Sequence, residues 1–227
     1  MPSHASPKLR PMRRHDLIYL EPSRWDVVLE RQLGSDQVDP LIRSWVHKGW
    51  PLISRRPSSY ETHGIALGLP LPPSLGKWRI PFIVQDQDIL TIQEPLSLAS
   101  AREQAPRQWQ QIFDELEFFA AHRGIELQVF GSLAWQALTG LDYLTLSSDI
   151  DLLFHVPSSA DMELLSSEIS KIEDNSPSRI DGEFIRRDGL AANWREFLPG
   201  GTDVLVKSME GVALLDGRRF TAGERLS

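Results

Sequence analysis

The chain has 227 residues, with 24 basic and 31 acidic side chains and a formal net charge of −7. This balance argues against a general nucleic-acid-binding protein, which presents a strongly positive surface. The lack of cysteine excludes disulfides, thiolate catalysis and iron–sulfur clusters, and the six histidines show no zinc-ligand spacing. A chain of this length can bury a substantial core and lies between one and two typical domains.

Residues 1–13 are expected to form a flexible N-terminus. The segment is basic, but Pro2, Pro7 and Pro11 interrupt any amphipathic targeting helix, and no apolar signal core follows. No stretch of the sequence is long and apolar enough to span a bilayer. We therefore expect a cytoplasmic protein that binds no membrane.

Residues 14–96 are predicted to form a small N-terminal domain. The region is rich in proline and tryptophan, and its apolar segments, at 17–20, 52–53 and 80–84, are short. This pattern favours short strands around one helix near residues 41–47. The region contains no catalytic set of side chains, so we expect it to supply a surface for the substrate or for a partner protein.

Several basic pairs are candidates for holding phosphates or an acidic partner, because positive surface can attract such molecules even when the net charge is negative. They are Arg55-Arg56, Lys77 with Arg79, Arg186-Arg187 and Arg218-Arg219. Each pair by itself is more typical of a solvated surface.

Residues 97–227 are predicted to form the catalytic domain. An amphipathic helix is expected within 97–122, ended near Gly124. A short strand at 126–130, a turn and an apolar helix at 133–138 follow it. Further along the chain we expect a helix at 160–172, with a loop at 174–178 behind it.

The turn before the helix at 133–138 consists of Gly131 and Ser132. Backbone N–H groups at a helix N-terminus have no intrahelical partner and carry the positive end of the helix dipole, so they can hold a polyphosphate. Gly131 lets the backbone approach a ligand closely, and Ser132 adds a hydroxyl. A Gly-Ser pair alone is usually only a turn.

Two carboxylates follow in an apolar segment, residues 148–156, that is typical of a strand. Side chains alternate between the faces of a strand, so Asp149 and Asp151 point to the face opposite Ile150 and Leu152. Such a pair repels itself unless a cation lies between the carboxylates, and its hard oxygen ligands suit Mg²⁺ or Mn²⁺. An Asp-x-Asp pair alone is usually a solvated face, but the order of strand, Gly-Ser turn, helix and Asp-x-Asp strand favours metal-assisted transfer of a phosphate-linked group.

These parts resemble the nucleotidyltransferase superfamily that includes the DNA polymerase beta-like enzymes. A narrower resemblance in the second half is carried by Gly131-Ser-Leu-Ala-Trp135, Leu138-Thr-Gly140, Tyr143-Leu144, Ser147-Ser-Asp-Ile-Asp-Leu-Leu153, Asp181-Gly-Glu183, Trp194-Arg-Glu196 and Val204-Leu-Val-Lys207. In the first half it is carried by Arg14-His-Asp16, Pro51-Leu-Ile-Ser-Arg-Arg56 and Leu67-Gly-Leu-Pro70. With these segments the chain resembles the malonate decarboxylase holo-acyl-carrier-protein synthase family, also called phosphoribosyl-dephospho-CoA transferase. The resemblance implies an α+β catalytic domain, a small mixed sheet flanked by helices, behind the smaller N-terminal domain.

Members of the superfamily use a third carboxylate on a later strand, and the segment 179–184 offers two candidates, Asp181 and Glu183. We favour Asp181 because Ile180 is the apolar neighbour expected in a strand. Gly182 makes the register after it uncertain, and a bulge there would bring Glu183 onto the same face. The alternative is that Asp181-Gly182 is a hairpin turn.

The resemblance implies that a serine of the apo acyl carrier protein of malonate decarboxylase attacks the α-phosphorus of 2′-(5″-triphosphoribosyl)-3′-dephospho-CoA and releases pyrophosphate. Asp149 and Asp151 would hold the metal ions. Asp181 would complete that site and is the candidate to accept the serine proton. Lys207 is a candidate for a triphosphate oxygen, although a surface lysine at the end of a strand is as good an interpretation. A general nucleotidyltransferase that moves a nucleoside monophosphate, and a catalytically silent binding module of the same fold, are the alternatives.

Three other residues carry less weight. In an unbroken strand His155 lies on the face of Asp151 and could touch substrate, although an ordinary hydrogen-bonded histidine is the more common case. Trp194 and Arg195 could contact the adenine end of the ligand, but tryptophan in the core and arginine at the surface is the better default.

Overall fold

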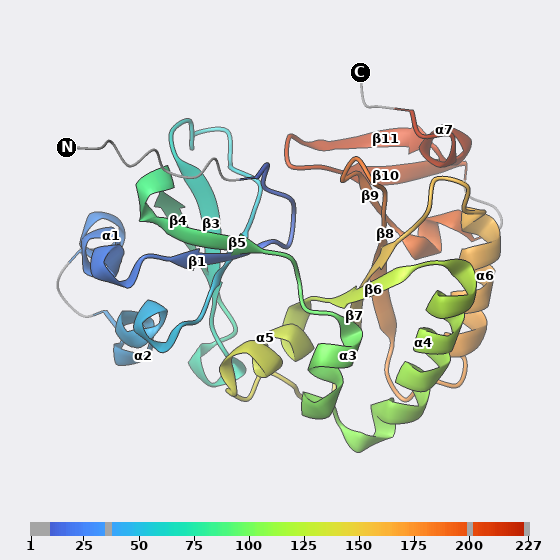
Figure 1. Ribbon diagram of the computed structural model, residues 1–227, viewed down its shortest axis with the longest axis horizontal. Helices are drawn as coiled ribbons and strands as arrows, with labels where there is room; N and C mark the ends of the chain where they lie inside the picture. Colours follow the sequence, from blue (N-terminus) through green and yellow to red (C-terminus); the bar gives the residue numbers. More distant parts are fainter. Residues whose placement is uncertain (1–9, 35–37, 199–201, 225–227) are drawn as a thin grey trace, which may run out of the picture. The chain divides into compact units, whose positions relative to one another are not determined.

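The computed structural model describes residues 10–34, 38–198 and 202–224, and the chain divides into two compact units at residues 94 and 95 (Figure 1). Most of the segment expected to be flexible, residues 1–13, lies outside the described residues. Within it, Arg10 donates two hydrogen bonds, of 2.8 and 2.9 Å, to the buried carboxylate of Asp16. Among the described residues, no helix combines the length and apolarity needed to cross a membrane.

The first unit is built on a five-stranded antiparallel sheet with the order β4-β3-β2-β1-β5. Its strands are β1 (Leu17–Leu20), β2 (Leu52–Ser54), β3 (Ile65–Pro70), β4 (Arg79–Val84) and β5 (Ile89–Gln93). The strands expected at 17–20, 52–53 and 80–84 are therefore confirmed. The helix expected near 41–47 is present as α2 (Pro40–Ser44), continued by a short 3₁₀ turn.

The expectation of a single helix in this unit was wrong. A longer one, α1 (Trp25–Leu33), precedes α2. It buries Trp25, Val28 and Leu29, which share one face at helical spacing, and the Trp25 ring packs on Phe82 of β4 with 5.2 Å between centroids.

The second unit is built on a six-stranded mixed sheet with the order β11-β10-β9-β8-β7-β6. Its strands are β6 (Glu126–Val129), β7 (Ile150–His155), β8 (Ile180–Ile185), β9 (Ala191–Asn193), β10 (Asp203–Lys207) and β11 (Val212–Asp216). Strands β7 and β8 are parallel and every other neighbouring pair is antiparallel. The expected mixed α+β architecture is confirmed.

The helices of this unit are α3 (Leu98–Ala101), α4 (Gln110–Arg123), α5 (Gly131–Thr139), α6 (Met162–Glu173) and α7 (Gly217–Thr221). The expected helix within 97–122 is interrupted, because Pro106 lacks an N–H donor and keeps Ala105 extended, with ψ 154°. Gly124 ends α4 in the left-handed conformation, as expected. The helix predicted at 160–172 is present as α6, two residues later at its start.

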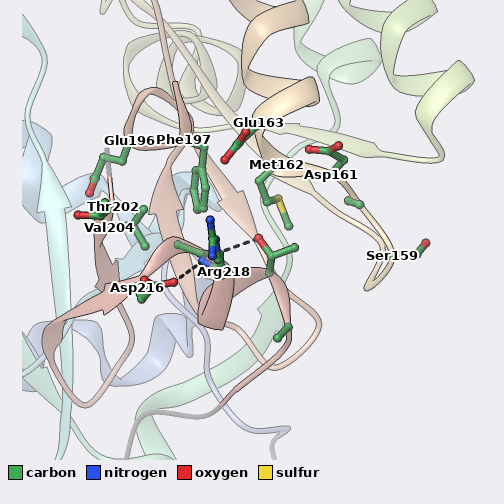
Figure 2. Close-up of a pocket in the computed structure, with 14 residues that line it drawn as sticks. Ser159, Asp161, Met162, Glu163, Glu196, Phe197, Thr202, Val204, Asp216 and Arg218 are labelled. Atoms are coloured by element: carbon green, nitrogen blue, oxygen red, sulfur yellow. Dashed lines mark hydrogen bonds between the residues drawn. The ribbon is translucent and has the colours of Figure 1, made fainter. Parts of the chain in front are cut away.

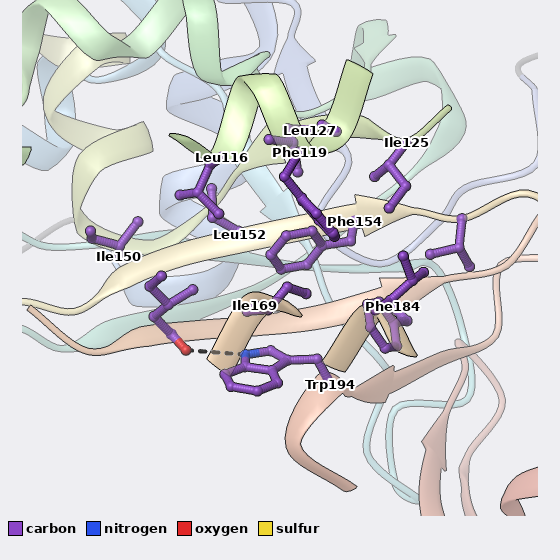
Figure 3. Packing of buried hydrophobic residues seen from close by; sticks show 14 of the residues in the cluster. Leu116, Phe119, Ile125, Leu127, Ile150, Leu152, Phe154, Ile169, Phe184 and Trp194 are labelled. Atoms are coloured by element: carbon purple, nitrogen blue, oxygen red, sulfur yellow. Dashed lines mark hydrogen bonds between the residues drawn. The ribbon is translucent and has the colours of Figure 1, made fainter. Parts of the chain in front are cut away.

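One face of this sheet and the helices α4 and α6 enclose the main core (Figure 3). Phe154 of β7 and Phe184 of β8 meet edge to face with 5.9 Å between centroids, and Phe119 of α4 and Ile169 of α6 belong to the same cluster. Burying this face of β7 and β8 leaves the side chains at the alternate positions on the opposite face. Those positions carry the predicted carboxylates.

Candidate functional site

Gly131 is the first residue of α5 and has a φ of +64°, a conformation that glycine adopts without a steric penalty. A Cβ built on it would lie 1.8 Å from Oδ2 of Asp151. Glycine is therefore required both by the backbone and by the approach of a carboxylate. The predicted helix is confirmed and Gly140 ends it, but it begins two residues earlier than predicted. Gly131 and the half-buried Ser132 therefore belong to its first turn and do not precede it.

The Asp151 carboxylate therefore lies at the N-terminus of α5, where the helix dipole favours negative charge. The preceding residue, Phe130, does not cap this helix with a side-chain hydrogen bond. The Phe130 N–H donates to the Asp151 carbonyl at 3.1 Å, which ties the turn to β7. The closest approach to Gly131 is thus made by a carboxylate of the same site.

Asp149 precedes β7, which begins at Ile150 and not at Ser148 as expected. Ser148 instead forms a turn, because its hydroxyl accepts a hydrogen bond from the Thr145 N–H at 2.9 Å. The Asp149 side chain is 40% exposed, and its Oδ2 lies 4.0 Å from the Arg179 guanidinium. Asp149 is therefore a half-exposed carboxylate at the entrance to β7.

Asp181 lies directly beside Asp151, because the parallel register of β7 and β8 pairs their Cα positions. Strand β8 runs from Ile180 to Ile185 without a register shift, so the alternative of a hairpin turn at Asp181-Gly182 is wrong. The bulge invoked for Glu183 is also absent. Regular alternation already places Glu183 on the face of Asp181.

The buried Glu183 is paired with Lys207, whose Nζ donates to Oε1 at 2.8 Å from β10 across the short strand β9. The lysine side chain is 28% exposed. Both predicted residues therefore lie on the carboxylate face of the sheet, but in the structure they neutralise each other. Lys207 does end its strand, as the alternative interpretation had it, but its ammonium is paired with a buried carboxylate.

Sequence reasoning missed Asn193, the last residue of β9. Its Oδ1 accepts from the Arg195 N–H at 3.0 Å, and this bond orients Nδ2 to donate to Oδ1 of Asp181, also at 3.0 Å. The antiparallel register that pairs Glu183 with Asn193 brings the amide to this place. Asparagine just before a helical turn is a capping signal in the sequence, but its second contact depends on the sheet.

The backbone of Ile180, next to Asp181, is held from both sides. Its N–H donates to Oε1 of Glu173 at 2.7 Å, and its carbonyl accepts from Arg195 at 3.0 Å and from the Trp194 indole at 3.1 Å. Arg195 also forms a bidentate pair with Glu173. Burial raises the pKa of Glu173, but the bonds from Arg195 and Ile180 outweigh it and leave that pKa below its ordinary value.

The structure also shows the surroundings of Trp194, Arg195 and His155, the three residues given less weight in the sequence analysis. Trp194 is completely buried, so the default interpretation as a core residue is confirmed (Figure 3). Arg195 is part of the ion pair described above and not simply a surface residue. His155 lies on the carboxylate face, as expected, and its Nε2 shares a 2.8 Å hydrogen bond with Gln128.

The predicted acidic residues Asp149, Asp151 and Asp181 lie at the start of two adjacent strands. Their carboxylate oxygens are hard donors of the kind that Mg²⁺ and Mn²⁺ prefer. Across residues 10–34, 38–198 and 202–224, however, no three acidic or histidine side chains are close enough together to hold a metal ion as they stand. Asp149 faces Arg179 and Asp181 accepts from Asn193, so the carboxylates would have to move closer together before they could share one ion.

A pocket of about 740 Å³ lies elsewhere in the same unit (Figure 2). It is formed by the start of α6 and by β10 and α7, at the far end of β7 from Asp149, and three of its carboxylates bond to backbone N–H groups. Asp161 accepts from Leu164, Asp216 accepts from Arg218, and Glu196 accepts from Leu205. These carboxylates cap helices or hold a strand. None of the predicted catalytic or metal-holding residues lines the pocket, but Arg218, a candidate for holding phosphates, does.

Comparisons with known proteins agree over both units. The model of the phosphoribosyl-dephospho-CoA transferase MdcG N-terminal domain matches residues 13–95, and that of the MdcG C-terminal domain matches residues 97–218. The chain belongs to the phosphoribosyl-dephospho-CoA transferase family. It is therefore a transferase, and the predicted family is confirmed.

Curated members of the family match nearly the whole chain. A phosphoribosyl-dephospho-CoA transferase of Bradyrhizobium diazoefficiens is 42% identical over 214 residues, which are 94% of this chain and 94% of that protein. One of Xanthomonas campestris pv. campestris is 35% identical over 203 residues, which are 89% of this chain and 93% of that protein. No solved structure matches the chain significantly.

Proposed function

We propose that this transferase moves phosphoribosyl-dephospho-CoA from 2′-(5″-triphosphoribosyl)-3′-dephospho-CoA to a serine hydroxyl of the apo acyl-carrier-protein subunit of malonate decarboxylase. A bond forms between the serine oxygen and the α-phosphorus. The bond from that phosphorus to the β-phosphate oxygen breaks, so pyrophosphate leaves and the serine proton is released. The observation that carries this proposal is the 42% identity to a phosphoribosyl-dephospho-CoA transferase across 94% of both chains.

The carboxylates at the start of β7 and β8 are the group to which we assign the chemistry. Asp149 and Asp151 would hold Mg²⁺ or Mn²⁺, with Asp181 completing the site through the carboxylate oxygen that Asn193 does not hold. Such an ion supplies positive charge to the phosphate oxygens on which negative charge develops. Asp181 is also our candidate to accept the serine proton, since Asn193 occupies only one of its two oxygens.

The phosphates themselves are assigned to the turn at the start of α5. Ser132 lies in its first turn, next to the Gly131 backbone, where N–H groups point toward an anion. We further propose that Lys207 exchanges its partner Glu183 for a triphosphate oxygen when the donor binds. That exchange would keep the lysine neutralised in both states.

We also propose that the second unit has the DNA polymerase beta-like nucleotidyltransferase fold. The order of its parts supports this: β6, the Gly131 turn, α5, the Asp strand β7 and a parallel neighbour β8 with a further carboxylate. Fold similarity alone does not establish chemistry, so the activity itself must be measured.

The test is intact-mass spectrometry of apo carrier protein after incubation with the enzyme, Mg²⁺ and the triphosphoribosyl donor. We expect a mass increase equal to one phosphoribosyl-dephospho-CoA group. A parallel reaction with ATP should leave the carrier unchanged. Adenylylation from ATP, or no added mass from a folded enzyme, would reject the proposed substrate.

The site is tested with Asp151→Asn beside Asp142→Asn, a matched loss of one charge at an exposed aspartate of the same unit. Loss of the charge that balances a catalytic cation is worth several kcal/mol in the transition state, so Asp151→Asn should slow transfer at least about 100-fold. Asp142→Asn should transfer at the normal rate. Equal transfer rates in the two variants would show that Asp151 is not part of the catalytic site.

A further inference from the structure

Two arginines of the first unit meet over the middle of β3. The side chain of Arg79, from the edge strand β4, lies across Gly68, where a Cβ would be 2.7 Å from its Cδ and 2.8 Å from its Cγ. Arg55 reaches the adjacent residue and donates from Nε to the Leu67 carbonyl at 3.0 Å. Gly68 therefore makes the space in which an arginine stem packs flat on the sheet beside a second guanidinium.

Only one of these two cations is neutralised. Arg55 forms a bidentate pair with Glu61, at 2.5 and 2.7 Å, and Glu61 also accepts from the Ser58 hydroxyl and N–H. The bonds from Arg55 and then from Ser58 lower the pKa of Glu61 to about 2, so this carboxylate stays ionised. Within the described part of the chain, Arg79 makes neither a hydrogen bond nor an ion pair with its guanidinium.

Arg79 also stands in an unfavourable environment for a cation. Burial, followed by the positive charge of Arg55, holds the pKa of its guanidinium below the ordinary value. The residue remains exposed enough for a ligand to reach it. Although the chain has seven more acidic than basic groups, none of the carboxylates in its described part pairs with Arg79. An anion from outside the chain would relieve the repulsion between the two arginines.

We propose that Arg79, supported by Arg55, is a subsite for a phosphate group of the substrate. This proposal rests on the proposed function, because a triphosphoribosyl-dephospho-CoA donor carries a triphosphate on its added ribose and a diphosphate between its adenosine and its pantetheine arm. A guanidinium presents a planar fork of N–H donors that matches two phosphate oxygens at once. Arg55, fixed by Glu61 and the Leu67 carbonyl, adds positive charge beside Arg79. The residues that form this subsite all belong to the first unit.

The experiment measures binding of pyrophosphate and of dephospho-CoA to the full-length protein by isothermal titration calorimetry, without carrier protein. Arg79→Met keeps the unbranched stem over Gly68 and removes the charge. Arg43→Met removes an exposed arginine of the same unit that lies on α2 and serves as the matched control. Circular dichroism establishes that both variants are folded.

We expect Arg79→Met to weaken binding of at least one of the two probes about tenfold or more, since it removes charge-assisted hydrogen bonds. Arg43→Met should bind both probes normally. Unchanged affinity for both probes in Arg79→Met, or an equal loss in the two variants, overturns the subsite. A higher KM for the carrier protein with unchanged probe binding would assign Arg79 to acidic groups of that partner and also overturn it.

The outcome does not depend on the transfer reaction. If Arg79 proves necessary for probe binding while the carrier protein gains no mass, the subsite stands and the proposed acceptor fails. If transfer occurs with normal probe binding by Arg79→Met, the proposed function stands and the subsite fails.

Discussion

Replacement of Gly131 by alanine tests the most tightly packed point of the candidate site. At a φ of +64° an alanine costs about 1–2 kcal/mol of folding free energy, because its Cβ approaches the following carbonyl. The new Cβ would also lie 1.8 Å from Oδ2 of Asp151, whereas ordinary contacts begin at 3.4 Å. The carboxylate must therefore move by about 1.6 Å, and a shift of about 1 Å at a catalytic group can slow a reaction about 100-fold.

Gly124 provides a matched control, because it has the same φ of +64° but no atom within 4 Å of a Cβ built on it. Gly124→Ala should lose about 1–2 kcal/mol of stability in urea unfolding from backbone strain alone, and Gly131→Ala should lose at least as much, because it carries the same strain and the contact with Asp151. Only Gly131→Ala should also lose transfer activity, measured as single-turnover labelling of the carrier protein. Equal activity in the two variants would refute the idea that the Asp151 position controls catalysis.

Two further predictions concern Asn193, which bonds to Asp181, and Glu173, which bonds to the backbone of the preceding residue. Asn193→Ala should lower kcat about tenfold by releasing the Asp181 carboxylate. Asn193→Asp keeps the acceptor for the Arg195 N–H but places a second carboxylate against Asp181, so it should be no more active than Asn193→Ala. An Asn193→Asp enzyme with normal kcat would contradict this. The pKa of Glu173 is lower in the folded state than in the unfolded state. The ionised Glu173 side chain therefore stabilises the fold fully above its unfolded pKa, and this stabilisation is lost as the pH falls through its folded pKa. The difference in unfolding free energy between wild type and Glu173→Gln should therefore shrink between about pH 6 and about pH 3, and a constant difference would exclude Glu173 as the source.

Local sequence signals predicted most elements of the second unit. The apolar segment around Ile150 and the glycines at 124 and 140 act over a few residues, so they mark strands and helix ends without knowledge of the fold. The elements of the N-terminal unit were harder to predict from the sequence. Helix α1 buries only Trp25, Val28 and Leu29, and its exposed Val27 and Leu33 blur the helical pattern.

The candidate site was predicted in part for the same reason. Alternation along one strand predicted that Asp149 and Asp151 share a face, but the neighbour of Asp151 depends on how β7 and β8 align across the helix α6 that joins them. No local signal gives that register. The bond from Asn193 to Asp181 has the same origin, because it requires the pairing of β8 with β9.

The strands β7 and β8 serve two purposes at once, and this limits how the site can be altered. Leu152 and Phe184 point into the core, while Asp151 and Asp181 occupy the alternate positions on the other face. Truncating a core residue would create a cavity and shift the strand, and therefore would displace the carboxylates together with it. An aspartate-to-asparagine change keeps the volume and alters only the charge. Charge substitutions on this face, more than truncations, are therefore the changes that separate catalysis from stability in this protein.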